Sequence, residues 1–437
     1  MTLKAGAAEI VITPPVGVEL AGYGFGPSVG MLDDLKAQAL VLRDGAEAAA
    51  IVTVDLLLVS AGFVARVRER VEAATGIPGA HVIVAASHSH SAPTAQSLRQ
   101  WGPVDPIYVR TLEDHLVGLV ALAARRCEPA RLSWGKGEVR TISENRRQSP
   151  DGVDWAVPVV RVDTAAGVPL AVLANFSCHP VTLHSYRNLL SPDYPGTMRR
   201  VVRGVLAQTG GTPVVMFTLG AAGDVNPAGY VAGGTTPARS WQVGAILGCE
   251  VAKAALEANA AAPDPVLAVA TDVVDLPVVP LPSEAALREV RDASVAEAAR
   301  LAAEGRPWAD VSVPEIMRDW AIDALAARVS GDVRTSVPCE VTALRIGPVA
   351  VAALPLEVFT ATGLATKAAS PAALTMVVTN ANGGVGYLPT EDAYTQGDYT
   401  NPEGLAPKIY GIYALAPEAE PLVRARTAAI IQTLYEG

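Results

Sequence analysis

The sequence has 437 residues, of which 50% are hydrophobic and 18% are charged, so it can bury a large core and long intrinsic disorder is excluded. Its 34 basic and 44 acidic side chains give a net charge of −10, which argues against nucleic acid or an anionic membrane surface as partner and favours a small-molecule substrate. The four cysteines form no CxxC pair, which indicates reduced thiols. Without a membrane-length apolar stretch or a recognisable secretory signal, we expect a cytoplasmic protein; the sequence indicates no oligomeric state.

Short β-branched runs predict strands, and the longer segments between them predict helices, as in a mixed α/β or α+β protein. Strands are expected at 9–13, 39–43, 50–54, 82–86, 159–162, 170–176, 214–219, 266–274, 341–346, 349–353 and 374–378, and helices at 61–75, 108–126, 196–208 and 240–258. Residues 283–330, rich in Glu, Arg and Ala, predict a helical excursion, either a lid or a peripheral layer. Because no linker divides the chain, we expect one catalytic domain over 1–437, with central β-sheets flanked by helices.

The most informative motif follows the strand at 82–86, where the chain reads SHSHSAP over residues 87–93. If the extended conformation persists, His88 and His90 project to the same side, as the ligands of a metal site do. The alternative is a pair of histidines in a polar turn.

A further histidine, His179, stands where the strand at 170–176 should leave the sheet, with His184 close behind it. Metal ligands and catalytic residues often occupy such strand ends. Cys178 should face away from His179 on an extended chain and is left out of the site.

A glycine-rich turn follows the strand at 214–219. Gly220 and Gly223 permit close backbone approach, and free N–H groups there could bind an oxyanion, while Asp224 could orient a histidine. A plain turn explains the same spacing.

Two late segments offer oxygen ligands. Glu357 follows an apolar strand and a proline, and Tyr387 follows a run of glycines. Glu357 could instead cap the helix after it, and Tyr387 could pack at an interface.

Taken together, these segments resemble the catalytic domain of the neutral/alkaline ceramidases, a family of zinc-dependent amidases. The resemblance rests on an ordered set: AAEIVITPP (7–15), Gly22 with Tyr23, SHSHSAP (87–93), Asn145 with Arg146, NFSCHP (175–180), GDVNP (223–227), LPLE (354–357) and GYLPTEDAY (386–394).

The resemblance implies the ceramidase catalytic-domain fold and one Zn²⁺ per chain. Its ligands would be His88, His179, Glu357 and Tyr387. His90 and Arg146 would lie near the substrate and the developing oxyanion, with Arg147 equally available.

Such a site would cleave an amide by attack of zinc-bound water, whose pKa falls toward about 7. Asn226 stands where the family has a serine, and it can donate a hydrogen bond but cannot act as a nucleophile. We also expect neither the C-terminal immunoglobulin-like domain nor the secretion signal of the longer ceramidases. We therefore expect a small, non-lipid amide as the substrate.

Four other functions fit parts of the pattern. A zinc esterase or lactonase would use the same site, and a ceramidase-like amidase would act on N-acyl lipids. A two-metal phosphoesterase would use Asp55 and Asp224 together with His88, His90 and His179. A non-catalytic binding module would require a missing ligand, and no ligand is missing.

Overall fold

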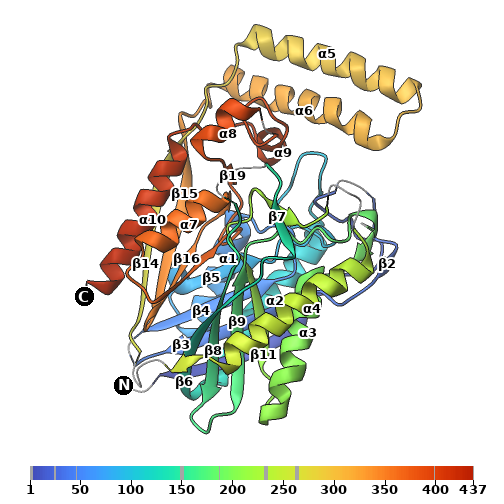
Figure 1. The fold of residues 1–437 in the computed structure, drawn as a ribbon. Coiled ribbons are helices and arrows are strands. Elements are labelled where there is room, and N and C mark those ends of the chain that lie inside the picture. Colours follow the sequence, from blue (N-terminus) through green and yellow to red (C-terminus); the bar gives the residue numbers. More distant parts are fainter. Residues whose placement is uncertain are drawn as a thin grey trace.

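The computed structural model describes residues 3–23, 26–45, 47–147, 152–186, 188–230, 235–260, 265–397 and 399–436 (Figure 1). Its helices are α1 (Ala61–Thr75), α2 (Pro106–Arg125), α3 (Tyr194–Leu206), α4 (Pro237–Leu256), α5 (Glu284–Ala303), α6 (Trp308–Ser330), α7 (Thr360–Ala369), α8 (Glu391–Gln396), α9 (Ala406–Tyr410) and α10 (Ala419–Tyr435), with 3₁₀ turns η1 (Gly79–His81), η2 (His184–Tyr186) and η3 (Ala207–Thr209).

The strands are β1 (Lys4–Val11), β2 (Gly30–Met31), β3 (Lys36–Arg43), β4 (Ala48–Val54), β5 (Val82–Ala86), β6 (Glu128–Glu138), β7 (Ser143–Asn145), β8 (Ala156–Thr164), β9 (Pro169–Phe176), β10 (Leu189–Leu190), β11 (Val214–Leu219), β12 (Val225–Pro227), β13 (Asn259–Ala260), β14 (Leu267–Pro277), β15 (Ser336–Ile346), β16 (Val349–Ala353), β17 (Leu356–Val358), β18 (Leu374–Val378) and β19 (Gly386–Leu388).

Two mixed sheets form the centre of the molecule. The larger has the order β11-β9-β8-β6-β1-β3-β4-β5, with β13 also paired to β6, and the smaller has the order β14-β15-β16-β18. The pairs β9–β11, β4–β5 and β16–β18 are parallel, and the other pairs in these two sheets are antiparallel. The expected fold class, a mixed sheet core flanked by helices, is confirmed.

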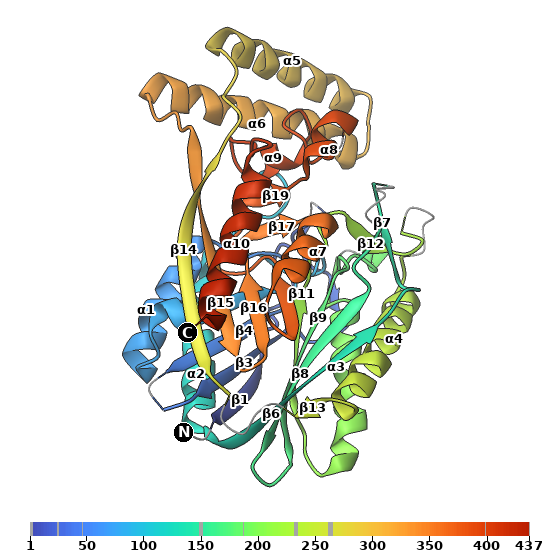
Figure 2. The same ribbon diagram turned by 60° about the vertical axis from the view of Figure 1, so that its left-hand side comes forward.

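The sheets pack face to face, and helices cover their outer faces, giving four layers (Figure 2). Strand β4 shows how the sequence specifies this arrangement. Val52 packs toward α1 and α2, whereas its neighbour Ile51 packs into the layer between the two sheets. Because both faces are covered, the strand is an unbroken apolar run rather than an alternating one.

Several short strands were not expected from the sequence, and among the long strands β1 and β6 differ for identifiable reasons. Strand β1 begins at Lys4 rather than at residue 9, because β3 and β6 both pair with its alanine-rich start. Strand β6 was not expected, since Gly135 and Gly137 interrupt its pattern. A Cβ on Gly135 would lie 2.4 Å from the carbonyl oxygen of Ala254, so close packing of α4 explains that glycine.

Helices α5 and α6 form an antiparallel pair that lies across one end of the molecule, next to α8, α9 and β19 (Figures 1 and 2). They occupy 284–330, where the sequence predicts a helical excursion. No helix in the described ranges combines the length and apolar character of a membrane span.

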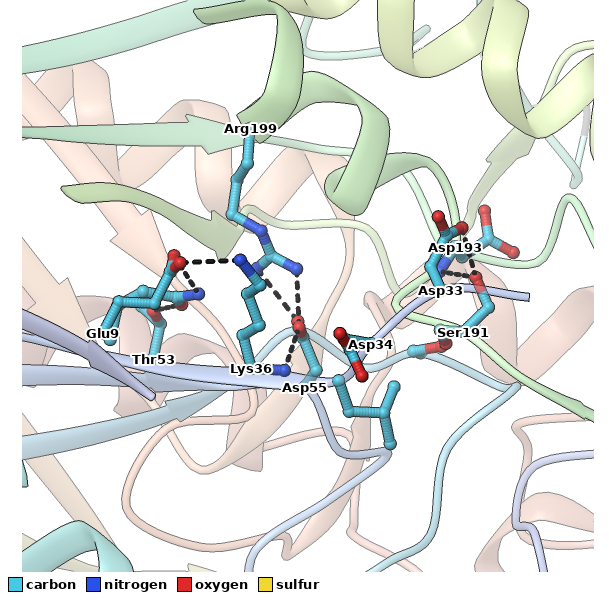
Figure 3. A network of polar contacts seen from close by, with 12 residues as sticks. Glu9, Asp33, Asp34, Lys36, Thr53, Asp55, Ser191, Asp193 and Arg199 are labelled. Carbon is cyan, nitrogen blue, oxygen red and sulfur yellow. Dashed lines mark hydrogen bonds and ion pairs between the residues drawn. The ribbon is translucent and has the colours of Figure 1, made fainter. Parts of the chain in front are cut away.

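A buried ion pair joins α3 to the end of β4 (Figure 3). Arg199 donates to both carboxylate oxygens of Asp55, at 3.0 and 2.5 Å, and the backbone N–H of Lys36 donates to Oδ2 at 2.9 Å. The Asp55 side chain is 0% exposed. This carboxylate is therefore committed to an arginine, and the phosphoesterase hypothesis that used it as a metal ligand is wrong.

Candidate metal centre

His88 lies just beyond the end of β5, in the left-handed region with φ of 65°. Its backbone N–H donates to the carbonyl of Leu56, and its Nδ1 lies 2.8 Å from the carbonyl oxygen of Leu57. The extended conformation expected for the motif therefore does not persist. The turn nevertheless brings the two imidazoles together, with ring centroids 4.9 Å apart.

His90 is held from the opposite side by the segment after β1. Its Nδ1 lies 3.0 Å from the carbonyl oxygen of Gly22. A Cβ on Gly22 would come within 2.6 Å of that same Nδ1, and Gly22 has φ of 98°. Glycine is thus required where the backbone meets this imidazole.

His179 follows β9 and is 2% exposed. Its Nδ1 lies 3.1 Å from the carbonyl oxygen of Val225, in the turn after β11. The backbone carbonyl of Val225 therefore orients this ring. From the sequence, we expected the Asp224 side chain to orient a histidine.

All three histidines share one pattern of hydrogen bonds. A carbonyl oxygen can only accept, so each Nδ1 is the protonated donor and each Nε2 carries a lone pair. The Nε2 atoms of His88 and His90 lie 3.3 Å apart, and ligand atoms of His88, His90 and His179 lie within 4.8 Å of one another. Facing lone pairs repel at this distance, and a cation between them removes the repulsion. The donor set fits a metal ion.

Protonation of the rings is a poorer solution. Burial lowers the pKa of His90 well below its ordinary value, and the neighbouring charges of His88 and His179 lower it further. Burial also lowers the pKa of His179, although Glu357 opposes this effect.

Glu357, on β17, completes the cluster and is 3% exposed. Its Oε2 lies 3.0 Å from Nε2 of His179 and 3.5 Å from Nε2 of His88, and Tyr410 donates a hydrogen bond to its Oε1. Burial alone would raise the pKa of this carboxyl, but His88 and His179 outweigh it and hold the pKa well below its usual value. Glu357 is therefore an ionised carboxylate facing two imidazoles.

Tyr387 is the register partner of Glu357 in the parallel pair β17–β19, so the two side chains leave the same face. Its hydroxyl accepts a hydrogen bond of 2.8 Å from Tyr399. Burial raises the pKa of Tyr387 well above its ordinary value, Glu357 raises it further, and Arg146 opposes both.

The two adjacent arginines have different surroundings. The guanidinium of Arg146 donates to the carbonyl of Gly223 and lies 4.8 Å from the ring centre of Tyr399. Arg147 donates to Asp392 at 3.2 Å, away from the histidines. Burial opposes the charge of Arg146, but the nearby tyrosines raise the pKa of this side chain above its ordinary value. Arg146 is therefore the arginine that reaches the site.

Comparisons with known proteins agree on one family, although no protein-family model matches the chain. Over 183 residues, 37% of this chain, the sequence is 27% identical to the neutral ceramidase of Pseudomonas aeruginosa, and the match spans 27% of that protein's length. The crystal structure of the Pseudomonas aeruginosa neutral ceramidase has a TM-score of 0.74 and 19% identity, covering 100% of this chain and 75% of that one. The structure of a ceramidase complexed with C2 has a TM-score of 0.74 and 18% sequence identity to this chain. That match covers 100% of this chain and 76% of the ceramidase chain.

The chain has the neutral ceramidase fold. The resemblance expected from the sequence motifs is confirmed by both comparisons.

In this ceramidase fold the histidine cluster opens into a cavity of about 390 Å³. Its lining comes from segments far apart in the sequence: Gly22, Tyr23, His90, Trp101, Arg146, His179, Val181, His184, Asn226, Tyr230, Trp308, Ala309, Ser312, Val313, Tyr387, Tyr399 and Leu405. Asn226 is thus on the cavity wall, where the family's serine was expected.

The glycine turn has a structural role that the sequence did not reveal. Gly220 and Gly223 do approach other backbone closely, as expected, but their N–H groups donate to the carbonyls of Phe176 and Val358. They are therefore not free to bind an oxyanion. The side chain of Asp224 accepts from Thr360, at the start of α7, and from Asn145. Asp224 rather than Glu357 caps that helix, and it does not orient a histidine.

Residues missed by the sequence reasoning are mainly tyrosines. Tyr399 lies between α8 and α9, and Tyr410 is the last residue of the short helix α9, where no strand end or spacing marks them. Tyr410 has its pKa raised well above the ordinary value by burial and by Glu357, so it is a neutral hydrogen-bond donor.

Proposed function

We propose that this chain is a zinc-dependent amidohydrolase that cleaves the C–N bond of a small, non-lipid N-acyl compound. The observation that carries the proposal is the convergence of the Nε2 atoms of His88 and His179 on the carboxylate of Glu357, with each imidazole fixed by a backbone carbonyl at its Nδ1. The name of the Pseudomonas aeruginosa relative, neutral ceramidase, supports amide hydrolysis as the reaction class.

His88, His179 and Glu357 would hold the metal, with Tyr387 as fourth ligand. Two neutral imidazoles and one carboxylate are a donor set that zinc accepts. The bound ion would lower the pKa of water toward about 7 and polarise the scissile carbonyl. The surroundings of Tyr387 raise its pKa and keep the phenol neutral. Tyr387 could therefore bind as a phenolate only if the charge of the metal lowered that pKa.

Residues of the chain supply the remaining functions. The guanidinium of Arg146, flanked by Tyr387 and Tyr399, would bind the oxyanion. His90 would hydrogen-bond the reacting groups from the cluster's edge, since its Nδ1 is held by Gly22. Asn226, which lines the same cavity, would orient the substrate by hydrogen bonding.

Metal content is the direct test. We expect about one zinc per chain by elemental mass spectrometry, with strong loss in His179→Ala and Tyr387→Phe. His115→Ala is the matched control, because this histidine is exposed on α2 and outside the cluster. His90→Ala should keep zinc and lose hydrolysis, and loss of zinc in that variant would make His90 a ligand instead.

The same preparations serve to separate the reaction classes. Short N-acyl 4-nitroanilides should be hydrolysed, and the corresponding 4-nitrophenyl esters and lactones test the esterase alternative. A protein that takes up no zinc from micromolar solution and cleaves none of these compounds would contradict the proposal.

A further inference from the structure

We propose that helix α6 is the wall that determines substrate size in this cavity, and that it restricts the enzyme to amides with a short acyl group. The inference rests on the proposed function, because it concerns the substrate of the same site. The inference goes beyond the proposed function, because it names the residues that select the substrate and the length of acyl group that they admit.

The first turns of α6 lie on the cavity. Trp308 and Ser312 are four residues apart, as are Ala309 and Val313, so they form one face of the helix, and all four line the space that also contains His90 and His179. The start of α6 therefore forms part of the wall of the same cavity as the candidate metal ligand His179.

Polar contacts fix this wall to the body of the protein. Asp323 pairs with Arg99 at 2.6 Å, and Asp319 accepts a hydrogen bond of 2.8 Å from Gln100. Trp320 donates to the carbonyl of Ile412 at 3.1 Å.

Apolar packing adds to these contacts. Ile316 is 0% exposed and packs with Trp101 and Ile409 in one apolar cluster. Polar contacts to two separate loops, together with a buried side chain, describe a docked helix rather than a loosely held lid.

The volume of this open cavity bears on the size of the group that it can hold. About 390 Å³ is at the low end of the roughly 300–1,000 Å³ that small-molecule sites occupy. Aromatic rings of Tyr23, Trp101 and Tyr230 form other parts of the lining, and such rigid groups cannot move aside cheaply. Helix α6 therefore limits the length of acyl chain that can lie inside the cavity.

The lining also selects by charge. None of the lining residues in the described part of the chain is acidic, and Arg146 is cationic. An uncharged acyl group suits this surface, whereas a substituent that carries an amine would meet Arg146 with no acidic side chain among the lining residues. The substrate class is therefore a short, uncharged N-acyl amide.

A chain-length series tests the assignment. The kcat/KM of the zinc-loaded protein is measured on N-acyl 4-nitroanilides from acetyl to palmitoyl, and binding of the matching linear carboxylates, which are the reaction products, is measured by calorimetry. We expect each methylene that reaches apolar wall to improve binding about fourfold, followed by a sharp loss beyond a short limit.

Variants of α6 should move that limit in opposite directions. Trp308→Ala should shift it to longer chains, and Val313→Trp should shift it to shorter ones. Val329→Ala, a matched control on the same helix, should leave it in place, because Val329 is 73% exposed and does not line the cavity.

The two readouts separate this inference from the proposed function. The variants could shift the longest carboxylate that binds while no amide is cleaved. That result supports the role of α6 and contradicts the proposed amidohydrolase activity. The variants could instead all cleave amides up to the same acyl length, or the protein could cleave the palmitoyl compound best. Either result contradicts the proposed role of α6. Absence of both cleavage and carboxylate binding contradicts both.

Discussion

The hydroxyl of Tyr410 donates a hydrogen bond to Oε1 of Glu357, while Oε2 of the same carboxylate lies 3.0 Å from Nε2 of His179. The two oxygens are thus assigned to different partners. The ring of Tyr410 packs beside Gly386, where a Cβ would lie 3.6 Å from its Cγ, an ordinary van der Waals contact. Tyr410 fixes the orientation of the carboxylate toward the histidines.

Replacing Tyr410 by phenylalanine should weaken metal binding without removing it. Hydrogen bonds that orient metal ligands are worth roughly 10–100-fold in affinity, and the ring would still fill its site. Competition with a zinc chelator measures the dissociation constant. Tyr413→Phe is the control, because the Tyr413 hydroxyl donates to Asp332 instead. Equal affinities in the two variants would show that Tyr410 only fills space.

Arg146→Lys should reduce kcat by about 10²-fold while zinc content stays at the wild-type level. Lysine keeps the positive charge but loses the planar group that lies over Tyr399 and the donors that would stabilise an oxyanion. Steady-state kinetics with a short N-acyl 4-nitroanilide measures the loss. Arg147→Lys is the matched control, since Arg147 pairs with Asp392 on α8. A larger loss of kcat in Arg147→Lys than in Arg146→Lys would show that Arg147, and not Arg146, binds the oxyanion.

Much of the site could be predicted from the sequence because its residues follow buried strands. His88 and His179 come directly after apolar runs, and such runs end at an edge of a sheet, where side chains of different strands meet. Glu357 was found for the same reason. Their mutual distances depend on how the two sheets pack, which no local pattern contains.

The missed features depend on contacts between distant segments. Tyr410 lies 53 positions from Glu357, at the end of the short helix α9, and only tertiary packing brings it to the carboxylate. Asp224 was given a histidine as partner because both lie in turns, whereas the start of α7 competes for its oxygens. The helical character of 283–330 was readable from composition, but its place above the cavity was not.

Arg199→Met should lower the free energy of unfolding by about 3–5 kcal/mol, because it leaves Asp55 charged and without its partner in the core. Combining it with Asp55→Leu should restore much of the loss, since apolar pairs can replace buried ion pairs. Urea unfolding followed by circular dichroism measures both variants. A small effect of Arg199→Met would mean that solvent reaches Asp55. Retained zinc binding in the double variant would agree with the absence of Asp55 from the metal site.

Asp193 should make the protein less stable as pH rises from about 4 to 7. It is 1% exposed, and burial raises its pKa from 3.8 to about 6, although hydrogen bonds from Thr182 and Tyr194 oppose the shift. Because the folded-state pKa is the higher one, the folded protein binds the proton more tightly. Lowering the pH through about 6 therefore stabilises the fold, and the effect is complete below about 4.

Asp193→Asn should remove this part of the pH dependence. The amide oxygen can still accept from Tyr194, and asparagine has nearly the same size as the aspartate that already adopts the φ of 60° and ψ of −154° at this position. Relative to wild type, the variant should gain up to about 3 kcal/mol at pH 7 and lose that advantage below about pH 4. Urea unfolding at several pH values measures the difference. Asp34→Asn, at an exposed carboxylate of the same region (Figure 3), is the control, and an unchanged slope in Asp193→Asn would assign the dependence to another group.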